Sequence, residues 1–117
     1  MLGLIASKLI LGAVLVGAVG IVAAFWKDLV DFLKKAIQKV KQLVEGVLYG
    51  SKVFLRKLRE GAKEISRHYS KVDGHWQETT VTKTISESQV PPEILERAKE
   101  CEELDITEEL EMQLESA

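Results

Sequence analysis

The chain has 117 residues, of which 46% are hydrophobic and 29% are charged, and its formal net charge is −2. This length suits one modest domain with short appendages. A single cysteine, Cys101, excludes a disulfide within the chain, which is typical of a reducing compartment. The small net charge hides three blocks, because residues 1–26 are hydrophobic, residues 27–71 are basic and residues 72–117 are acidic. Such asymmetry usually indicates an interaction, either between the blocks or with an outside partner.

Residues 1–26 are predicted to form a hydrophobic helix that enters a membrane or a closely packed helical assembly. No side chain from Leu9 to Trp26 is charged, and a helix of that length spans about 27 Å, at the short end of a bilayer crossing. Phe25 and Trp26 close the segment where interfacial aromatic residues lie. One helical stripe has small side chains, which let helices approach closely in lipid: Ala13, Gly17, Gly20 and Ala24.

Three interpretations of this segment stay open. A cleaved signal peptide is disfavoured, because only Lys8 precedes the apolar core and an aromatic residue and a lysine follow it. A buried helix in an oligomer is a second interpretation, since periodicity does not distinguish a protein interior from lipid. A single-pass anchor is the third, and the lysines after Trp26 then place the C-terminal part in the cytoplasm.

Residues 27–67 are predicted to form a long basic amphipathic helix, because apolar positions recur at spacings of three and four. A bend is expected near Gly50. The basic side chains are candidate contacts for an anionic lipid or an oligonucleotide: Lys34, Lys35, Lys39, Lys41, Lys52, Arg56, Lys57, Arg59 and Lys63. Neutralisation by the acidic block is the alternative. The aromatic residues here, Tyr49, Phe54 and Tyr69, are too sparse for a base-stacking platform.

Residues 68–90 are predicted to form a β-hairpin, because Asp73-Gly74 lies between runs rich in threonine, valine and aromatic residues. Alternation along the second strand places Trp76 and the even-numbered residues on one face and the odd-numbered residues on the other. Residues 91–117 are predicted to form an acidic segment of short helices, which Pro92 opens. The predicted fold class is therefore mainly α with a small β-hairpin, in an oligomer.

Motifs that carry chemistry are missing from the sequence. It has no glycine-rich phosphate loop, no Ser/His/Asp arrangement, no zinc-ligand spacing and no dinucleotide fingerprint. We therefore predict a protein that is not an enzyme, with no catalytic residues, no metal site, no cofactor and no small-molecule substrate.

In its length, its apolar start through Trp26 and its mixed helix and hairpin remainder, the chain resembles the HalA-type membrane effectors of the bacterial Hailong anti-phage defence system. The resemblance implies an oligomer, with a tetramer favoured, whose apolar helices are released into the inner membrane as an ion-permeable channel. It also implies a nucleotidyltransferase partner that makes a controlling DNA oligomer, for which the basic residues are candidate contacts.

The favoured hypothesis from the sequence is thus a membrane-acting, pore-forming effector of abortive infection at the bacterial inner membrane, held inactive by a partner or an oligonucleotide. One alternative is a membrane anchor or scaffold that recruits a cytosolic partner. The other is a basic nucleic-acid-binding module.

Overall fold

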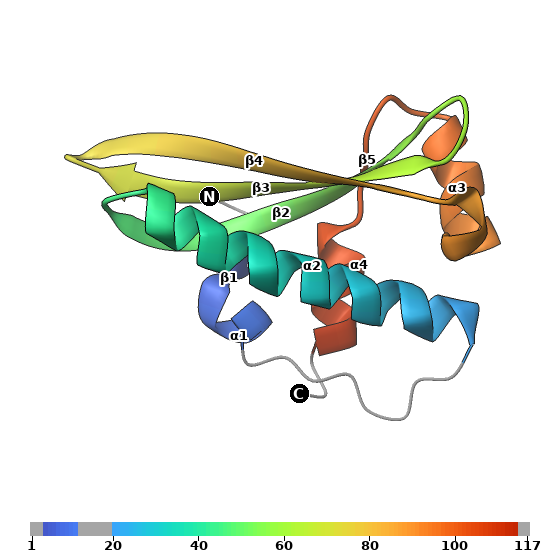
Figure 1. Cartoon of the computed structure of the whole chain (residues 1–117), viewed down its shortest axis with the longest axis horizontal. Helices are drawn as coiled ribbons and strands as arrows, with labels where there is room; N and C mark the ends of the chain where they lie inside the picture. Colours follow the sequence, from blue (N-terminus) through green and yellow to red (C-terminus); the bar gives the residue numbers. More distant parts are fainter. Residues whose placement is uncertain (1–3, 12–19, 115–117) are drawn as a thin grey trace.

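The computed structural model describes residues 4–11 and 20–114, and an antiparallel sheet organises them (Figure 1). Its three long strands are β2 (Val47–Lys57), β3 (Ala62–Val72) and β4 (His75–Ile85), paired in that order. Two short strands, β1 (Ile5–Ala6) and β5 (Leu104–Asp105), pair with β2 at different places along its outer edge. The helices are α1 (Ser7–Leu11), α2 (Ile21–Leu43), α3 (Pro92–Lys99) and α4 (Thr107–Leu114), with a short turn of 3₁₀ helix, η1 (Glu87–Gln89).

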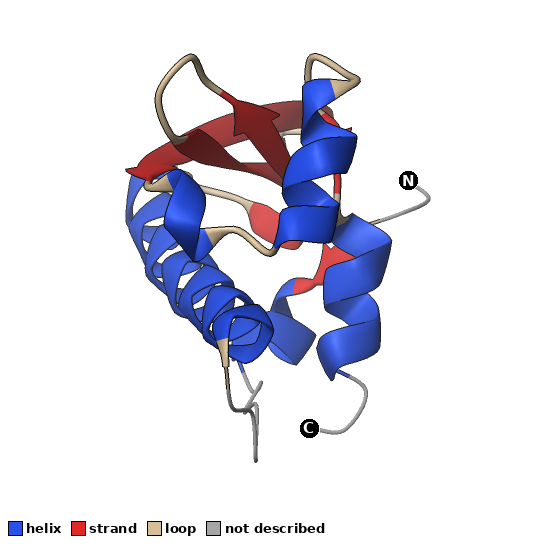
Figure 2. Ribbon diagram, turned by 90° about the vertical axis from the view of Figure 1, so that its right-hand side faces the viewer, coloured by secondary structure: helices blue, strands red, loops and turns tan. Residues whose placement is uncertain are grey.

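The helices leave one face of the sheet open. Helix α2 runs beneath the long strands, and α1 and α4 lie on the same side (Figures 1 and 2). The core fills the space between this helical layer and the inner face of the sheet, with Leu29, Leu33 and Ile37 of α2 almost fully buried. No helix of the described residues lies over the outer face (Figure 2). The molecule therefore has two layers, and only one face of the sheet takes part in the core.

The prediction of a mainly α fold is wrong, because residues 47–72 form β2 and β3 instead of the second half of a long helix. Helix α2 ends at Leu43, and Val44 is already extended. In β2 the side chains alternate, with Ser51, Val53 and Leu55 buried and the residues between them more exposed. This is the period of a strand with one face covered.

The turn between β3 and β4 lies where the sequence predicts it. Val72 and His75 are paired around Asp73-Gly74, and both turn residues have positive φ, 50° and 81°. Two positive φ angles are the signature of a type I′ turn, whose twist matches that of the flanking strands. The hairpin is longer than predicted, however, because β3 pairs with β4 from Ala62 to Val72 and also with β2 along its other side.

A β-bulge in β2 lies between Leu48 and Gly50. Gly50 also allows β1 to approach, since a Cβ atom there would lie 2.7 Å from the carbonyl oxygen of Ile5. The bulge turns Tyr49 toward the outer face, where its ring meets that of Trp76.

The apolar N-terminal segment is not a single helix. In the described residues it contains β1 and α1, and α2 then begins at Ile21 and continues far past Trp26. No helix in the described ranges combines the length and the apolar character that a bilayer crossing requires. The predicted transmembrane helix, the pore-forming character based on it and the inner-membrane location are therefore contradicted. Phe25 and Trp26, expected at a membrane interface, are 2% and 4% exposed in the core.

The acidic C-terminal segment folds onto the rest of the domain. Pro92 lies in the first turn of α3, as its missing N–H allows. Asp105 accepts a hydrogen bond from the Thr107 backbone N–H at the start of α4, 2.9 Å away. Ile106, Leu110 and Leu114 then bury this last helix against the core.

Candidate functional site

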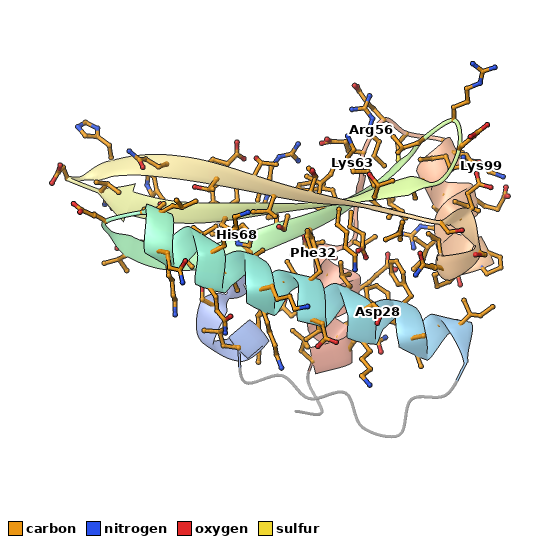
Figure 3. All side chains as sticks on the ribbon, viewed as in Figure 1. Asp28, Phe32, Arg56, Lys63, His68 and Lys99 are labelled. Atoms are coloured by element: carbon orange, nitrogen blue, oxygen red, sulfur yellow. The ribbon has the colours of Figure 1, made fainter. Side chains whose placement is uncertain are left out.

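The outer face of the sheet gathers basic and aromatic side chains from all three long strands. Alternation along β2 and β3 places on this face the residues that do not enter the core. We call this surface the basic–aromatic face. It comprises Tyr49, Lys52, Phe54 and Arg56 of β2, Lys63, Arg67, Tyr69 and Lys71 of β3, and Trp76 of β4. Figure 3 shows Arg56 and Lys63 on the side of the sheet away from α2.

Like charges stand directly opposite each other at two places on this face. Arg56 of β2 is paired with Lys63 of β3, and Lys52 is paired with Arg67. Opposite charges at such positions stabilise a sheet, whereas like charges destabilise it by several tenths of a kcal/mol, roughly. Lys52 and Lys63 make no ion pair with any other described residue. The fold thus places Arg56 opposite Lys63, and Lys52 opposite Arg67, although like charges at these positions lower its stability.

Aromatic rings lie beside these cations. The Tyr49 and Trp76 rings are 4.9 Å apart, and the two side chains are 47% and 48% exposed. The Lys71 ammonium lies 5.6 Å from the centre of the Trp76 ring, and the Arg67 guanidinium lies 4.5 Å from that of Phe54. Exposed aromatic surface of this kind is costly in water and suits stacking against a planar ligand.

Arg67 forms ion pairs with two acidic side chains of the protein. Its Nη2 donates to Glu103 Oε2 at 2.9 Å, and its Nε lies 3.8 Å from Glu78 Oε1. The hydrogen bond to Glu103 raises the pKa of Arg67, and the same bond lowers the pKa of Glu103. Glu103, which precedes β5, therefore places one carboxylate at the centre of a cationic surface.

Tyr69 is also tied to the acidic side chains of this face. Its hydroxyl donates to Glu78 Oε1 at 2.8 Å. Burial and the neighbouring Glu78 carboxylate raise the pKa of Tyr69 to about 12. The phenol therefore stays neutral at physiological pH, and its ring is held in place on the sheet.

The inner face of β3 carries polar residues instead, and α2 covers them. His68 is fully buried, with its Nδ1 2.7 Å from Ser51 Oγ and its Nε2 2.8 Å from Ser66 Oγ. The Ser66 hydroxyl donates to the Val81 carbonyl, so its oxygen accepts from His68 Nε2–H. In this neutral tautomer Nδ1 accepts from the Ser51 hydroxyl. Figure 3 shows His68 between the sheet and α2. This Ser-His-Ser cluster is closed to a substrate, and it supports the core.

The predicted anionic-partner residues separate into groups. Lys52, Arg56 and Lys63 lie together on the basic–aromatic face. Lys57, at the end of β2, forms an ion pair with Glu87, and Arg59 is exposed in the following loop. The remaining four lie on α2, on the other side of the molecule: Lys34, Lys35, Lys39 and Lys41.

The predicted helix-packing residues do not form a continuous stripe in the described residues. Ala13 and Gly17 lie outside the described ranges. Gly20 is the N-cap of α2 with a φ of 99°, and Ala24 is exposed on its first turns.

The residues predicted from the sequence to contact an anionic partner did not include Arg67 or Lys71, and the aromatic residues of this stretch were judged too sparse for stacking. The signal for them was the alternation of residues 47–57 and 62–72, which the helical interpretation concealed.

Comparisons with protein-family models, with curated proteins and with solved structures found no match for this chain. In the part of the chain that the structure describes, no three His, Cys, Asp or Glu side chains gather as metal ligands. The candidate site is the basic–aromatic face. Its cations can contact a polyanion, and its rings can stack on planar groups of the same ligand.

Proposed function

We propose that the basic–aromatic face binds single-stranded nucleic acid. The observation that carries this proposal is the pair of like-charge cross-strand contacts, Arg56 with Lys63 and Lys52 with Arg67, on an open sheet face flanked by exposed rings. Ion pairs with Glu103 and Glu78 offset the repulsion at Arg67, but the contact of Arg56 with Lys63 costs stability and has no such structural role. A phosphate backbone laid across the strands relieves both repulsions at once.

The order of side chains along the strands supports a chain-like ligand. On β3 the outer residues Lys63, Arg67, Tyr69 and Lys71 are accessible, whereas Ile65 is 4% exposed, and neighbouring outer positions lie about 7 Å apart, so the Tyr69 ring lies between two cations. Cations contact phosphates, and rings between them stack on bases that are not already paired. A duplex keeps its bases stacked inside, so the rings favour a single strand over a duplex.

This proposal takes up the nucleic-acid-binding alternative from the sequence. The DNA oligomer that the resemblance to HalA-type effectors implies is one ligand of this class. The tetramer, the nucleotidyltransferase partner and a role in anti-phage defence stay predictions.

Fluorescence anisotropy with labelled 12-nucleotide DNA and RNA strands tests the proposal. We expect saturable binding at low salt, with the logarithm of the affinity falling against the logarithm of salt concentration with a slope of about −3 for four to five phosphate contacts. Absence of binding of either strand at low salt would remove the proposal.

Two charge reversals with the same change in net charge provide the matched comparison. Lys63→Glu alters the basic–aromatic face, whereas Lys39→Glu alters the exposed side of α2. We expect Lys63→Glu to weaken binding at least tenfold and to reduce the salt slope by about 1, and Lys39→Glu to change the affinity less than twofold. Equal losses in both variants would indicate attraction to net charge and would contradict a site on the sheet.

Trp76 reports on the stacking part of the proposal. A base stacked on its exposed ring quenches its fluorescence, and Trp26→Phe leaves Trp76 as the single tryptophan. We expect Trp76→Leu to lower the affinity roughly tenfold, since stacking contributes about 1–3 kcal/mol per base, without changing the salt slope. A slope change with unchanged affinity would contradict stacking at this ring.

A further inference from the structure

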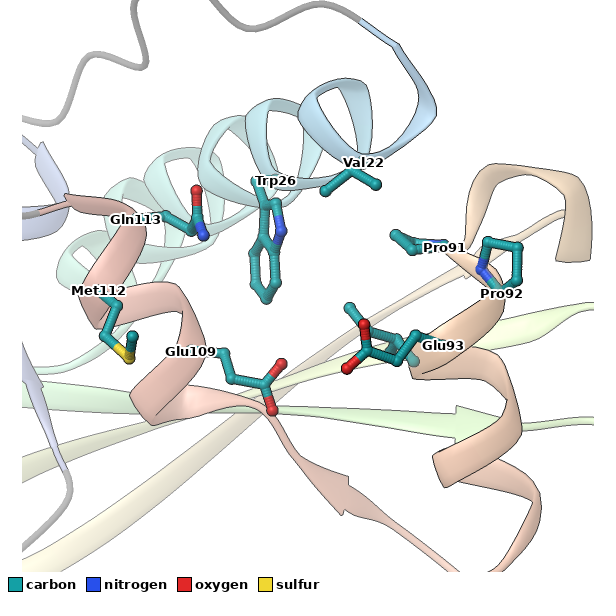
Figure 4. Close-up of a pocket in the computed structure, with 9 residues that line it drawn as sticks. Val22, Trp26, Pro91, Pro92, Glu93, Glu109, Met112 and Gln113 are labelled. Atoms are coloured by element: carbon teal, nitrogen blue, oxygen red, sulfur yellow. The ribbon is translucent and has the colours of Figure 1, made fainter.

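A separate cavity lies at the opposite side of the core from the basic–aromatic face. It has a volume of about 300 Å³ and opens between the first turns of α2, the start of α3 and α4 (Figure 4). We call it the Trp26 cavity. Its lining residues are Val22 and Trp26 of α2, Pro91, Pro92, Glu93 and Ile94 around the start of α3, and Glu109, Met112 and Gln113 of α4. This volume is at the lower end of the range for small-molecule sites.

The walls of the Trp26 cavity are apolar, and one aromatic ring is fixed among them. The Trp26 ring is packed at 72° against Phe25, with ring centres 5.1 Å apart, so its orientation is set by the core. Val22 and Met112 at the rim are 55% and 68% exposed. Large apolar side chains left in water around a concave site gain stability when a ligand covers them.

Two carboxylates face the opening of the cavity. In Figure 4 the side chains of Glu93 and Glu109 point toward each other below the Trp26 ring. Arg97 Nη2 lies 2.5 Å from Glu109, while Glu93 makes no ion pair with any described residue. The surrounding segment is acidic, because residues 93–111 contain many glutamates and only Arg97 and Lys99 as cations. The field at the opening therefore attracts positive charge.

The chemistry of the lining selects among ligand classes. A neutral apolar ligand would displace water from Glu93 and Glu109 without replacing their hydrogen bonds, which is costly. An anion would be repelled. A metal ion would find two carboxylates in the lining and no further charged ligand. An organic ammonium ion supplies a cation to Glu93, which has no ion pair in the described residues, and to Glu109 beside Arg97, and it covers the apolar walls with its carbon atoms.

We propose that the Trp26 cavity binds a small alkylammonium ion, with its charged nitrogen between Glu93 and Glu109 and its alkyl chain against Trp26, Val22 and Met112. This site is independent of the nucleic-acid interface on the far side of the sheet.

A titration of tryptophan fluorescence tests this proposal in the full chain. The chain has two tryptophans, and Trp76→Phe leaves Trp26 as the only emitter. The probe is n-butylammonium chloride, n-butanol is its neutral counterpart of similar shape, and sodium chloride controls for ionic strength. We expect a saturable change with butylammonium and a response to butanol at least tenfold weaker.

Two isosteric substitutions on α3 provide the matched comparison. Glu93 lines the cavity, whereas Glu96 pairs with Lys99 at the surface. We expect Glu93→Gln to weaken butylammonium binding about fivefold to tenfold and Glu96→Gln to leave it within twofold. Both side chains are exposed, so neither substitution threatens the fold.

The indole N–H resonance of Trp26 in a proton–nitrogen correlation spectrum gives a second readout that does not depend on quenching. A resonance that moves with butylammonium in proportion to occupancy supports the site. The proposal is overturned if neither fluorescence nor this resonance responds, if butanol binds as tightly as butylammonium, or if Glu93→Gln and Glu96→Gln weaken binding equally.

Discussion

Glu64 and His68 are buried titratable residues on the inner face of β3, and burial shifts their pKa values in opposite directions. Burial raises the pKa of Glu64 from 4.5 to about 7, with Asp28 adding to the rise and Lys83 opposing it. Burial lowers the pKa of His68 from 6.5 to about 4. The neutral form of each residue therefore predominates between about pH 4 and pH 7, as a low dielectric favours.

The two shifts act on stability with opposite signs. Glu64 binds a proton more tightly in the folded protein, so its contribution to stability falls as pH rises from about 4.5 to about 7. His68 binds a proton less tightly in the folded protein, so its contribution is complete above about 6.5 and is lost as pH falls toward 4. Because the two residues titrate over overlapping pH ranges, their opposite effects on the unfolding free energy largely cancel in the native sequence.

We predict that in Glu64→Gln the pH dependence of the unfolding free energy follows the contribution of His68 alone. The variant keeps the shape of the side chain and removes the charge, so it should stabilise the protein by roughly 2 kcal/mol at pH 8 and by little at pH 4.5. Its unfolding free energy should then rise steadily from pH 4 to 6.5. Urea unfolding at a series of pH values measures this, and Glu60→Gln at an exposed loop position is the control. A stabilisation that is the same at pH 4.5 and pH 8 would contradict the assignment to Glu64.

Residues of the candidate site could be predicted in part, for a geometric reason. Lys52 and Arg56 are four positions apart, and that spacing places two side chains on one face of a helix and also on one face of a strand. They were therefore grouped correctly although the element was wrong. Arg67 and Lys71 have the same spacing, but the alternation that joins them to Lys63 across the sheet is visible only once β2 and β3 are known to pair.

At the scale of elements, the prediction of a helix over residues 47–65 was wrong because the spacing of their buried side chains was misassigned. The predicted helix assumes apolar positions at spacings of three and four, yet in the structure Ser51 is polar and buried and Phe54 lies on the outer face. Buried residues at 51, 53 and 55 alternate with outward ones, the pattern of a strand. Apolar residues on the outer side weakened that alternation, because Phe54 belongs to the basic–aromatic face and its cross-strand partner Ile65 is 4% exposed.

Strong local signals were predicted well. The Asp73-Gly74 turn, the strand faces after it and the start of α3 near Pro92 depend on backbone chemistry within a few residues. Pairing of β3 with β2 depends on contacts between distant parts of the chain, which no local pattern contains.

We predict that Lys63→Glu stabilises the sheet while it destroys nucleic-acid binding. The glutamate faces Arg56 across the strands and replaces a repulsion by an attraction, worth roughly 0.5–1 kcal/mol. Urea unfolding at low salt measures the gain, which should shrink at high salt because the charges are on the surface. A variant that loses both stability and binding would indicate that Lys63 supports the fold and would contradict the functional interpretation of the like-charge pairs.

At the scale of the whole molecule, the three blocks of the sequence become surfaces. The apolar block supplies part of the core through Phe25 and Trp26, much of the basic block forms the outer face of the sheet, and the acidic block covers the end that bears α3 and α4. The expected contact between basic and acidic blocks occurs through the ion pairs of Lys57 with Glu87 and of Arg67 with Glu78 and Glu103, and the pair of Arg67 with Glu103 lies on the basic–aromatic face.

This pair sets the resting charge of the basic–aromatic face. Glu103 forms an ion pair with the Arg67 guanidinium on this face. The Arg67 side chain is 23% exposed and the Glu103 side chain is 28% exposed. A phosphate that binds Arg67 must therefore displace or repel the Glu103 carboxylate. In the proposed nucleic-acid interface, Glu103 of the acidic block would compete with a phosphate for Arg67.

We predict that Glu103→Gln tightens the binding of a 12-nucleotide single strand about fivefold. The substitution frees Arg67 for a phosphate and removes a negative charge from the middle of the face, and its cost to the fold is less than about 1 kcal/mol because the pair is partly exposed. Glu102→Gln is the matched control, since it changes net charge equally at an exposed neighbouring position that has no ion pair with a described residue. Fluorescence anisotropy at fixed salt measures both. A gain in affinity rules out damage to the fold as its cause, whereas an equal gain in both variants would show that Glu103 acts only through net charge.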